Sequence, residues 1–227
     1  MEVDHEHRVS ALIMLPPSAR ACFVLAHGAG AGMTHPLMEA VAGGLSEVGI
    51  ATLRFQFPYM EKGSRRPDPP ALCHATVRAA VERATRLSHG LPIIGGGRSF
   101  GGRMTSQAQA KAALPGVVGL AFLGFPLHPA GRPSDERARH LADVTVPMLF
   151  LQGSRDELAE LSLLQPLMQQ LGDRASLKLF EDANHSFHVP ARSGRNDRQV
   201  LDELVQALDD WIGPVIDAST TRSTSAR

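Results

Sequence analysis

LPIIGGGRSFGGR, residues 91–103, joins a short apolar run to a glycine-rich turn centred on Ser99. The apolar run predicts a buried strand over residues 91–95, and a helix is expected from Phe100 to about Ala113. The turn matches the pattern G-x-S-x-G, in which the serine hydroxyl is exposed above a sheet and flanking side chains would collide with the neighbouring strand and helix. The pattern is common, and the alternative is that Ser99 only caps the helix.

Around this turn, short apolar runs alternate with longer segments of helical period, which is typical of βαβ units. Strands are expected at residues 9–15, 21–26, 50–57, 117–125, 147–152 and 175–180, and helices at residues 36–48, 72–87, 157–171 and 200–211. A helix N-cap is expected at Asp68. The sequence therefore predicts an α/β fold, with a mostly parallel, doubly wound sheet of about six to seven strands flanked by helices.

Length and composition restrict the class of protein further. The 227 residues suit one domain, residues 1–213, followed by a disordered tail, residues 214–227, of which the last nine are rich in Ser, Thr and Arg. Because 23 basic residues balance 23 acidic ones, no overall charge favours nucleic acid or an anionic membrane, and a small-molecule substrate is the expected partner. Two cysteines and no long apolar run indicate a cytoplasmic protein.

Four polar clusters follow four of the predicted strands. They are HGAG at residues 27–30, GRSFG at 97–101, GSRD at 153–156 and DANH at 182–185. In open α/β sheets, sites form beyond the carboxyl ends of the strands, where the loops converge. The sequence therefore predicts one site built from these four loops.

The chemistry of a serine nucleophile selects residues within these loops. A serine hydroxyl needs a base within hydrogen-bond reach, and the base needs an acid that orients it. His185 and Asp156 follow Ser99 in the chain order serine, acid, histidine that this type of sheet requires. Alone, His185 could be a solvated loop residue and Asp156 a helix cap, but their joint placement favours a catalytic triad.

Other residues could compete for these roles. Glu181 and Asp182 lie too close to His185 along the chain and are expected to brace its loop, while Glu157 is a weaker rival of Asp156. His188, three residues beyond His185, could suggest a metal pair, but no third ligand is evident and Pro190 disfavours a helix. We interpret His188 as structural and expect no metal and no cofactor.

An oxyanion hole needs two backbone N–H donors. Phe100, directly after the nucleophile, is expected to supply one, and Ala29 in the HGAG loop the other, with Gly30 as a further substrate contact. A dinucleotide or phosphate cradle is the competing interpretation of the glycines. It fails because the spacing is not G-x-G-x-x-G and no Lys-Ser/Thr pair follows.

With these residues identified, the chain resembles the α/β-hydrolase superfamily from about residue 9 to 212. Its motifs are similar to those of a small, lidless, dienelactone-hydrolase-like branch that includes testis-expressed protein thirty and a subunit of the NSL histone-acetyltransferase complex. The motifs are HGAGAGM (27–33), LRFQFPYM (53–60), GGRSFGGRM (96–104), GFPLHP (124–129), LQGSRDEL (151–158) and ANHSF (183–187). The resemblance implies the α/β-hydrolase fold and the triad but no substrate, and dienelactone hydrolases proper use a cysteine where this chain has Ser99.

Large caps in this fold usually lie between the strands that residues 126–146 connect. That segment is short, so minimal or no cap is expected, which suits a small or exposed ester. The resulting prediction is a carboxylesterase-like serine hydrolase, although a thioesterase, peptidase or acyltransferase would share the acyl-enzyme step. The alternative is a catalytically silent interaction module.

Arginines near the predicted site raise a hypothesis about the substrate. Arg98 and Arg103 flank the nucleophile, and Arg54, Arg65 and Arg66 lie on or after another strand exit. They could bind an anionic substrate, with Arg98 the first candidate. Ion pairs with acids such as Glu61 or Asp68 are the alternative. The oligomeric state stays open.

Overall fold

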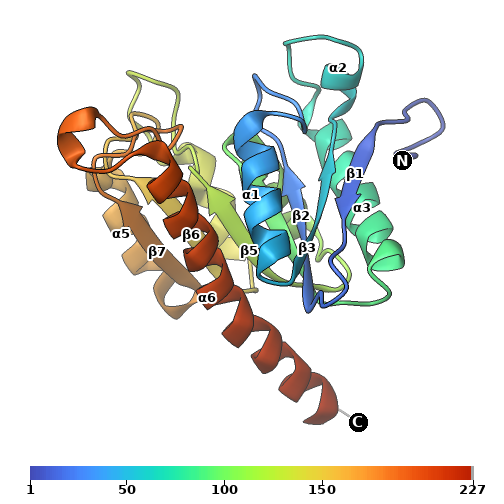
Figure 1. The fold of residues 1–227 in the computed structure, drawn as a ribbon. Helices are drawn as coiled ribbons and strands as arrows, with labels where there is room; N and C mark the ends of the chain where they lie inside the picture. Colours follow the sequence, from blue (N-terminus) through green and yellow to red (C-terminus); the bar gives the residue numbers. More distant parts are fainter. Residues whose placement is uncertain (226–227) are drawn as a thin grey trace.

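The computed structural model describes residues 1–225 and contains one seven-stranded sheet (Figure 1). The strands are β1 (Ala11–Met14), β2 (Ala21–Ala26), β3 (Ile50–Phe55), β4 (Ile93–Arg98), β5 (Val117–Leu123), β6 (Met148–Gly153) and β7 (Ala175–Phe180). Their spatial order is β1-β3-β2-β4-β5-β6-β7, with β1 antiparallel to β3 and all other pairs parallel. The predicted fold class is confirmed.

Helices cover both faces of this sheet. They are α1 (Pro36–Glu47), α2 (Pro58–Glu61), α3 (Pro70–Leu87), α4 (Phe100–Lys111), α5 (Leu161–Leu171) and α6 (Asp197–Ser225). α1 and α6 pack on one face, and α3, α4 and α5 on the other (Figure 1). Three short 3₁₀ helices complete the described elements: η1 (Glu136–Asp143), η2 (Gly172–Arg174) and η3 (Ala191–Ser193).

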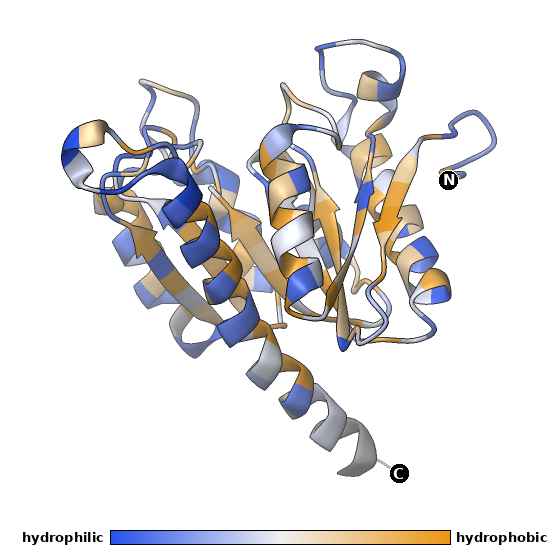
Figure 2. Cartoon of the chain, viewed as in Figure 1, coloured by the Kyte–Doolittle hydropathy of each residue, from blue (hydrophilic) through white to orange (hydrophobic). Residues whose placement is uncertain are grey.

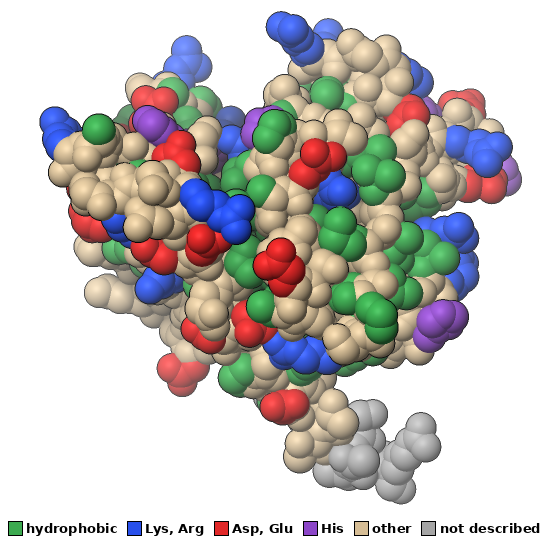
Figure 3. All heavy atoms as spheres, in the orientation of Figure 1, with side chains coloured by type: hydrophobic (Ala, Val, Ile, Leu, Met, Phe, Trp, Pro, Cys, Tyr) green, Lys and Arg blue, Asp and Glu red, His purple; other side chains and the backbone are tan. Residues whose placement is uncertain are grey.

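Alternation along the strands fills two cores. In β2, Cys22 and Val24 join the core under α3 and α4, whereas Phe23 and Leu25 join the core under α1 and α6. Because both faces are buried, the central strands are largely apolar, as Figure 2 shows. On the outer face seen in Figure 3, acidic and basic side chains are intermixed, in keeping with the zero formal net charge.

The predicted tail is wrong where the structure describes it. Helix α6 continues past Gly213 to Ser225, and residues 226–227 lie outside the described part of the chain. The reason is that the apolar face of the helix persists: Ile216 is buried in the core that α6 shares with α1. Pro214 is accommodated within this helix.

Several other boundaries differ from expectation. β4 starts at Ile93 and continues through Gly96 and Gly97 to Arg98, because these glycines pair with β2 and β5. α5 starts at Leu161 instead of residue 157. Asp68 is not a helix cap, since its carboxylate accepts from the Tyr59 amide.

The chain crosses the sheet at the boundary between β2 and β4. After β2 it passes to β3 on one side, and α3 then returns it to β4 on the other. Beyond the ends of β2 and β4 lie His27 and Ser99. Such a crossover leaves a crevice where loops converge, which is the usual place for a site in an open α/β sheet.

Candidate active site

Ser99 occupies the tight turn between β4 and α4. Its backbone has φ 49° and ψ −116°, a left-handed conformation that is uncommon for a non-glycine residue and costs about 1–3 kcal/mol. A Cβ on Gly97 would lie 2.2 Å from the Ala26 carbonyl oxygen, and one on Gly101 would lie 2.5 Å from that of His27. The two glycines therefore let the turn approach the end of β2, as the sequence predicted.

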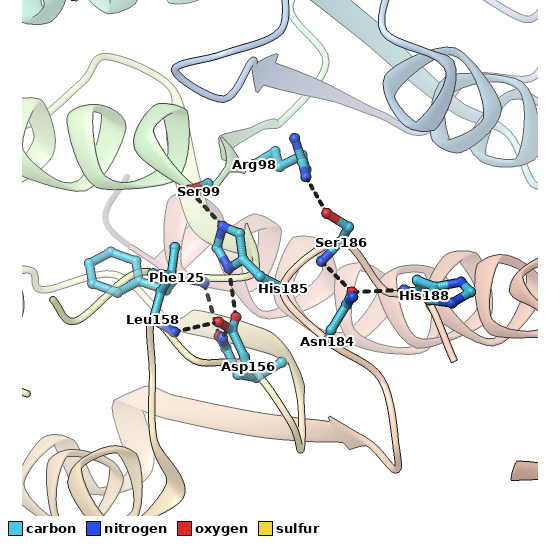
Figure 4. Close-up of polar contacts among 10 residues, drawn as sticks. Arg98, Ser99, Phe125, Asp156, Leu158, Asn184, His185, Ser186 and His188 are labelled. Carbon is cyan, nitrogen blue, oxygen red and sulfur yellow. Dashed lines mark hydrogen bonds and ion pairs between the residues drawn. The ribbon is translucent and has the colours of Figure 1, made fainter. Parts of the chain in front are cut away.

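Three side chains from three strand exits meet at this turn (Figure 4). His185 Nε2 lies 2.9 Å from Ser99 Oγ, and His185 Nδ1 lies 2.7 Å from Asp156 Oδ2. The geometry suits an Nδ1–H tautomer that donates to the carboxylate while Nε2 accepts from the serine hydroxyl. The structure thus brings together the three residues that the sequence singled out.

The Asp156 carboxylate is fully buried and accepts from three donors. Oδ1 accepts from the Leu158 amide at 2.8 Å, while Oδ2 accepts from His185 Nδ1 and from Gln152 Nε2. Gln152, at the end of β6, also accepts from the Phe125 amide at 2.9 Å. The buried side-chain amide of Gln152 therefore connects Asp156 to the segment that follows β5. Sequence reasoning missed Gln152, since no local pattern marks it.

Replacing Gln152 by Leu is expected to lower kcat/KM by about 10-fold, because Asp156 loses a charge-assisted hydrogen bond. The Phe125 amide also loses its acceptor, which costs about 1–3 kcal/mol of stability. Gln109→Leu is the matched control, since this buried glutamine accepts from the Leu114 amide but contacts no residue of the triad. Kinetics and urea unfolding of both variants would check the prediction; equal activities would contradict it.

The rivals of Asp156 and His185 lie elsewhere. Asp182 pairs with Arg155 at 2.9 Å, and Glu181 accepts from Ser154. His188 pairs with Asp197 and is 63% exposed. Glu157 is exposed.

The loop that carries His185 is fixed by its own asparagine. Asn184 Oδ1 accepts from the backbone amides of Ser186 and His188, at 2.8 and 3.1 Å. Phe187 in the same loop has φ 61° and buries its ring against Phe180. An Asx turn of this kind orients the histidine between two anchored ends. Asn184 was not singled out from the sequence, although asparagine is typical of such turns.

His27 organises the HGAG loop after β2. Its ring is buried, Nδ1 lies 2.7 Å from the Gly28 carbonyl oxygen, and Nε2 accepts from the Phe57 amide at 3.0 Å. In a trans peptide the N–H points opposite to the carbonyl, so holding the Gly28 oxygen directs the Ala29 N–H away from His27. The Tyr59 hydroxyl donates to the Ala29 oxygen at 3.0 Å.

The expected oxyanion donors are the amides of Ala29 and Phe100. Among the hydrogen bonds of the described residues, neither amide donates to a protein acceptor. Phe100 is the first residue of α4, where amides have no intrahelical partner. Gly30 is exposed, with open space where its side chain would be. Both amides are thus available for a ligand.

Between pH 7 and pH 5 the free energy of unfolding is expected to fall, because burial lowers the pKa of His27 to about 4. In this window the unfolded chain takes up a proton that folded His27 does not, which removes about 2 kcal/mol by pH 5. His140, whose pKa burial also lowers to about 4, acts in the same direction. Urea unfolding at both pH values, with NMR titration of the His27 ring, would check this. Protonation of that ring near pH 6.5 would contradict it.

The arginines do not have the partners considered from the sequence. Glu61 accepts from Ser10, Asp68 accepts from the Tyr59 amide, and Arg54 lies 3.7 Å from Glu39. Arg103 lies over the Phe100 ring, 5.6 Å from its centroid. Arg98 donates to Ser186.

Within residues 1–225, no group of three or more His, Cys, Asp or Glu side chains could hold a metal ion. In the same range no helix is both long and apolar enough to cross a bilayer.

Comparison with known proteins agrees with this fold. Three similar solved structures are a dienelactone hydrolase from Anabaena variabilis (21% identity, TM-score 0.74, covering 91% of this chain and 92% of that one), an α/β serine hydrolase homologue from Coxiella burnetii (19%, 0.70, 89% and 90%) and a serine hydrolase without a lid from Xanthomonas campestris (22%, 0.69, 89% and 89%). At these identities the likeness concerns the fold. The closer resemblance to testis-expressed protein thirty and the NSL-complex subunit stays a prediction. A family model described as an alpha/beta hydrolase domain matches residues 19–213, and the chain belongs to that family.

Proposed function

We propose that the protein is a serine hydrolase that cleaves a small or exposed ester through an acyl-enzyme intermediate. The observation that carries this proposal is the unbroken hydrogen-bonded chain from Ser99 through His185 to the buried Asp156. Two unpaired backbone amides, of Ala29 and Phe100, support it further. The same residues would serve thioesters or amides, which differ in the leaving group.

In the first half of the proposed reaction, Ser99 Oγ attacks the ester carbonyl carbon while its proton passes to His185 Nε2. The carbonyl oxygen becomes an oxyanion that accepts from the Ala29 and Phe100 amides. When the intermediate collapses, the carbon–oxygen bond to the alcohol breaks and His185 Nε2 returns the proton to the leaving oxygen. The products are the free alcohol and an acyl group on Ser99.

In the second half, a water oxygen attacks the acyl carbon and gives its proton to His185 Nε2. Collapse breaks the bond to Ser99 Oγ, which takes the proton back, and a carboxylic acid leaves. Asp156 accepts from Nδ1–H throughout and stabilises the imidazolium that forms twice. The enzyme ends as it began, so no further reactant is required.

The structure of the segment between β5 and β6 is an argument for an ester that is exposed on a larger molecule. Residues 124–147 form loops and the short η1, without a helical lid. Leu127 and His128 in this segment donate to the Leu158 carbonyl, next to the acid, which holds the segment near the sheet. An acyl group on a larger molecule could therefore reach Ser99.

Labelling with a fluorophosphonate, located by mass spectrometry, tests the proposal directly. We expect the adduct on Ser99, together with hydrolysis of some members of a panel of short esters, thioesters and amides. A well-folded protein with neither adduct nor turnover would overturn the proposal and favour an interaction module.

A further inference from the structure

Arg98 is a cation beside the nucleophile without a carboxylate partner. Within residues 1–221, whose side chains the structure describes, the arginines with an Asp or Glu oxygen within 4.0 Å are Arg20, Arg54, Arg139, Arg155, Arg195 and Arg198. Arg98 is absent from this set, although it directly precedes Ser99. An exposed arginine can stay hydrated and then needs no carboxylate partner. The burial of Arg98 therefore decides whether the missing partner costs free energy.

The Arg98 side chain lies between two loops that border Ser99. Nη2 donates to Ser186 Oγ at 3.1 Å, next to His185, and Nη1 lies 3.4 Å from the position that a Cβ on Gly28 would take. Figure 4 shows one terminal nitrogen directed to Ser186 and the other directed away from the triad. A group bound to that nitrogen would lie beside the HGAG loop, which carries the proposed oxyanion donor Ala29.

This guanidinium is partly removed from water. Burial lowers the pKa of Arg98, and its Nε is buried without a hydrogen-bond partner. The charge of Asp156 favours the charged form of Arg98, but both Asp156 oxygens already accept from Leu158, Gln152 and His185. A half-buried charge without an anionic partner is costly, and a bound anion would offset that cost.

We propose that Arg98 binds a carboxylate carried by the substrate, so that the enzyme prefers anionic esters to neutral ones of the same size. The inference rests on the proposed serine hydrolase function and names its substrate class. A guanidinium suits this role because its planar N–H donors match the geometry of a carboxylate. The carboxylate could lie on the acyl or on the alcohol part, and two substrate pairs separate these cases.

The acyl pair is 4-nitrophenyl hemiglutarate and its neutral counterpart, 4-nitrophenyl 4-carbamoylbutanoate. The alcohol pair is 4-acetoxybenzoate and 4-acetoxybenzamide. In at least one pair, we expect the wild-type protein to show the higher kcat/KM for the anionic member. Arg98→Met should reduce this preference by roughly 10- to 100-fold, since a hydrogen bond to a charged group is lost. Arg98→Lys should retain part of it.

Two controls separate the subsite from general effects of charge. Arg83→Gln removes one positive charge from an exposed position on α3 and should leave the preference unchanged. Added salt should reduce the preference of the wild-type protein, because ions screen the attraction. If Arg98 were only structural, Arg98→Met would lower kcat/KM for both members of a pair alike, and added salt would not change the preference of the wild-type protein.

The outcomes distinguish this inference from the function on which it rests. If a fluorophosphonate labels Ser99 but both pairs are hydrolysed without preference, or if Arg98→Met keeps the preference, the carboxylate subsite is wrong and the serine hydrolase stands. If Ser99 is not labelled and no ester is hydrolysed, the proposed function fails and the subsite fails with it.

Discussion

Ser99→Ala is expected to lower kcat for any ester that the protein hydrolyses by roughly 10⁴- to 10⁶-fold and to abolish fluorophosphonate labelling. The variant removes the atom that forms the acyl bond, while His185, Asp156 and both backbone donors stay in place. Little stability should be lost, because alanine retains the Cβ and Ser99 makes no side-chain cap to α4. Initial rates and intact-protein mass spectrometry would measure both effects.

A second serine–histidine pair, formed between α4 and η1, provides the control for Ser99→Ala. Ser106 Oγ lies 2.8 Å from His140 Nε2, a distance similar to that in the triad. Ser106 is buried, however, and it lies beyond the reach of a reagent in solution. Ser106→Ala should therefore keep labelling and turnover. Persistent activity in Ser99→Ala would show that another residue is the nucleophile.

Asp156→Asn is expected to lower kcat/KM by roughly 10⁴-fold. The carboxylate accepts from the Leu158 amide, Gln152 and His185, whereas an asparagine can accept only through its single oxygen. Its NH₂ group would face one of these donors, and its neutral amide would no longer supply the negative charge that stabilises the His185 imidazolium. Steady-state kinetics on the most active ester would measure the effect.

Asp182→Asn is the matched control for this variant. Asp182 follows a strand as Asp156 does and lies closer to His185 along the chain, but it pairs with Arg155 at the surface. Its replacement should change kcat/KM by less than about threefold, because exposed ion pairs contribute about 0–1 kcal/mol. If the two variants lost similar amounts of activity, the assignment of Asp156 as the orienting acid would be wrong.

The succession of strands along the chain and the meeting of Ser99, Asp156 and His185 could be predicted because both follow from short-range patterns. Buried parallel strands are apolar throughout, and the carboxyl ends of such strands converge at one edge of the sheet. Polar residues directly after each apolar run therefore had few other places to lie. The flanking glycines Gly97 and Gly101 followed from the turn itself.

Features that depend on contacts between distant segments could not be predicted. Gln152 contacts Asp156 and Phe125 only because β5 and β6 are neighbours. Glycines favour turns, so β4 was expected to end before Gly96, yet tertiary pairing keeps that segment extended. In the same way, Leu127 and His128 bond to the Leu158 carbonyl before α5 starts. The segment after Gly213 is mostly polar, so its composition gave no indication that Ile216 is buried.

The arrangement of the site across the sheet also has a consequence for folding. The three triad residues follow β4, β6 and β7 along the chain, and the HGAG loop follows β2. The reacting groups therefore come from segments far apart in sequence. Pairings at long sequence separation form slowly because chain entropy must first be lost. A refolding chain should therefore gain its helices before it gains a reactive serine, and reactivity would report the completion of the sheet.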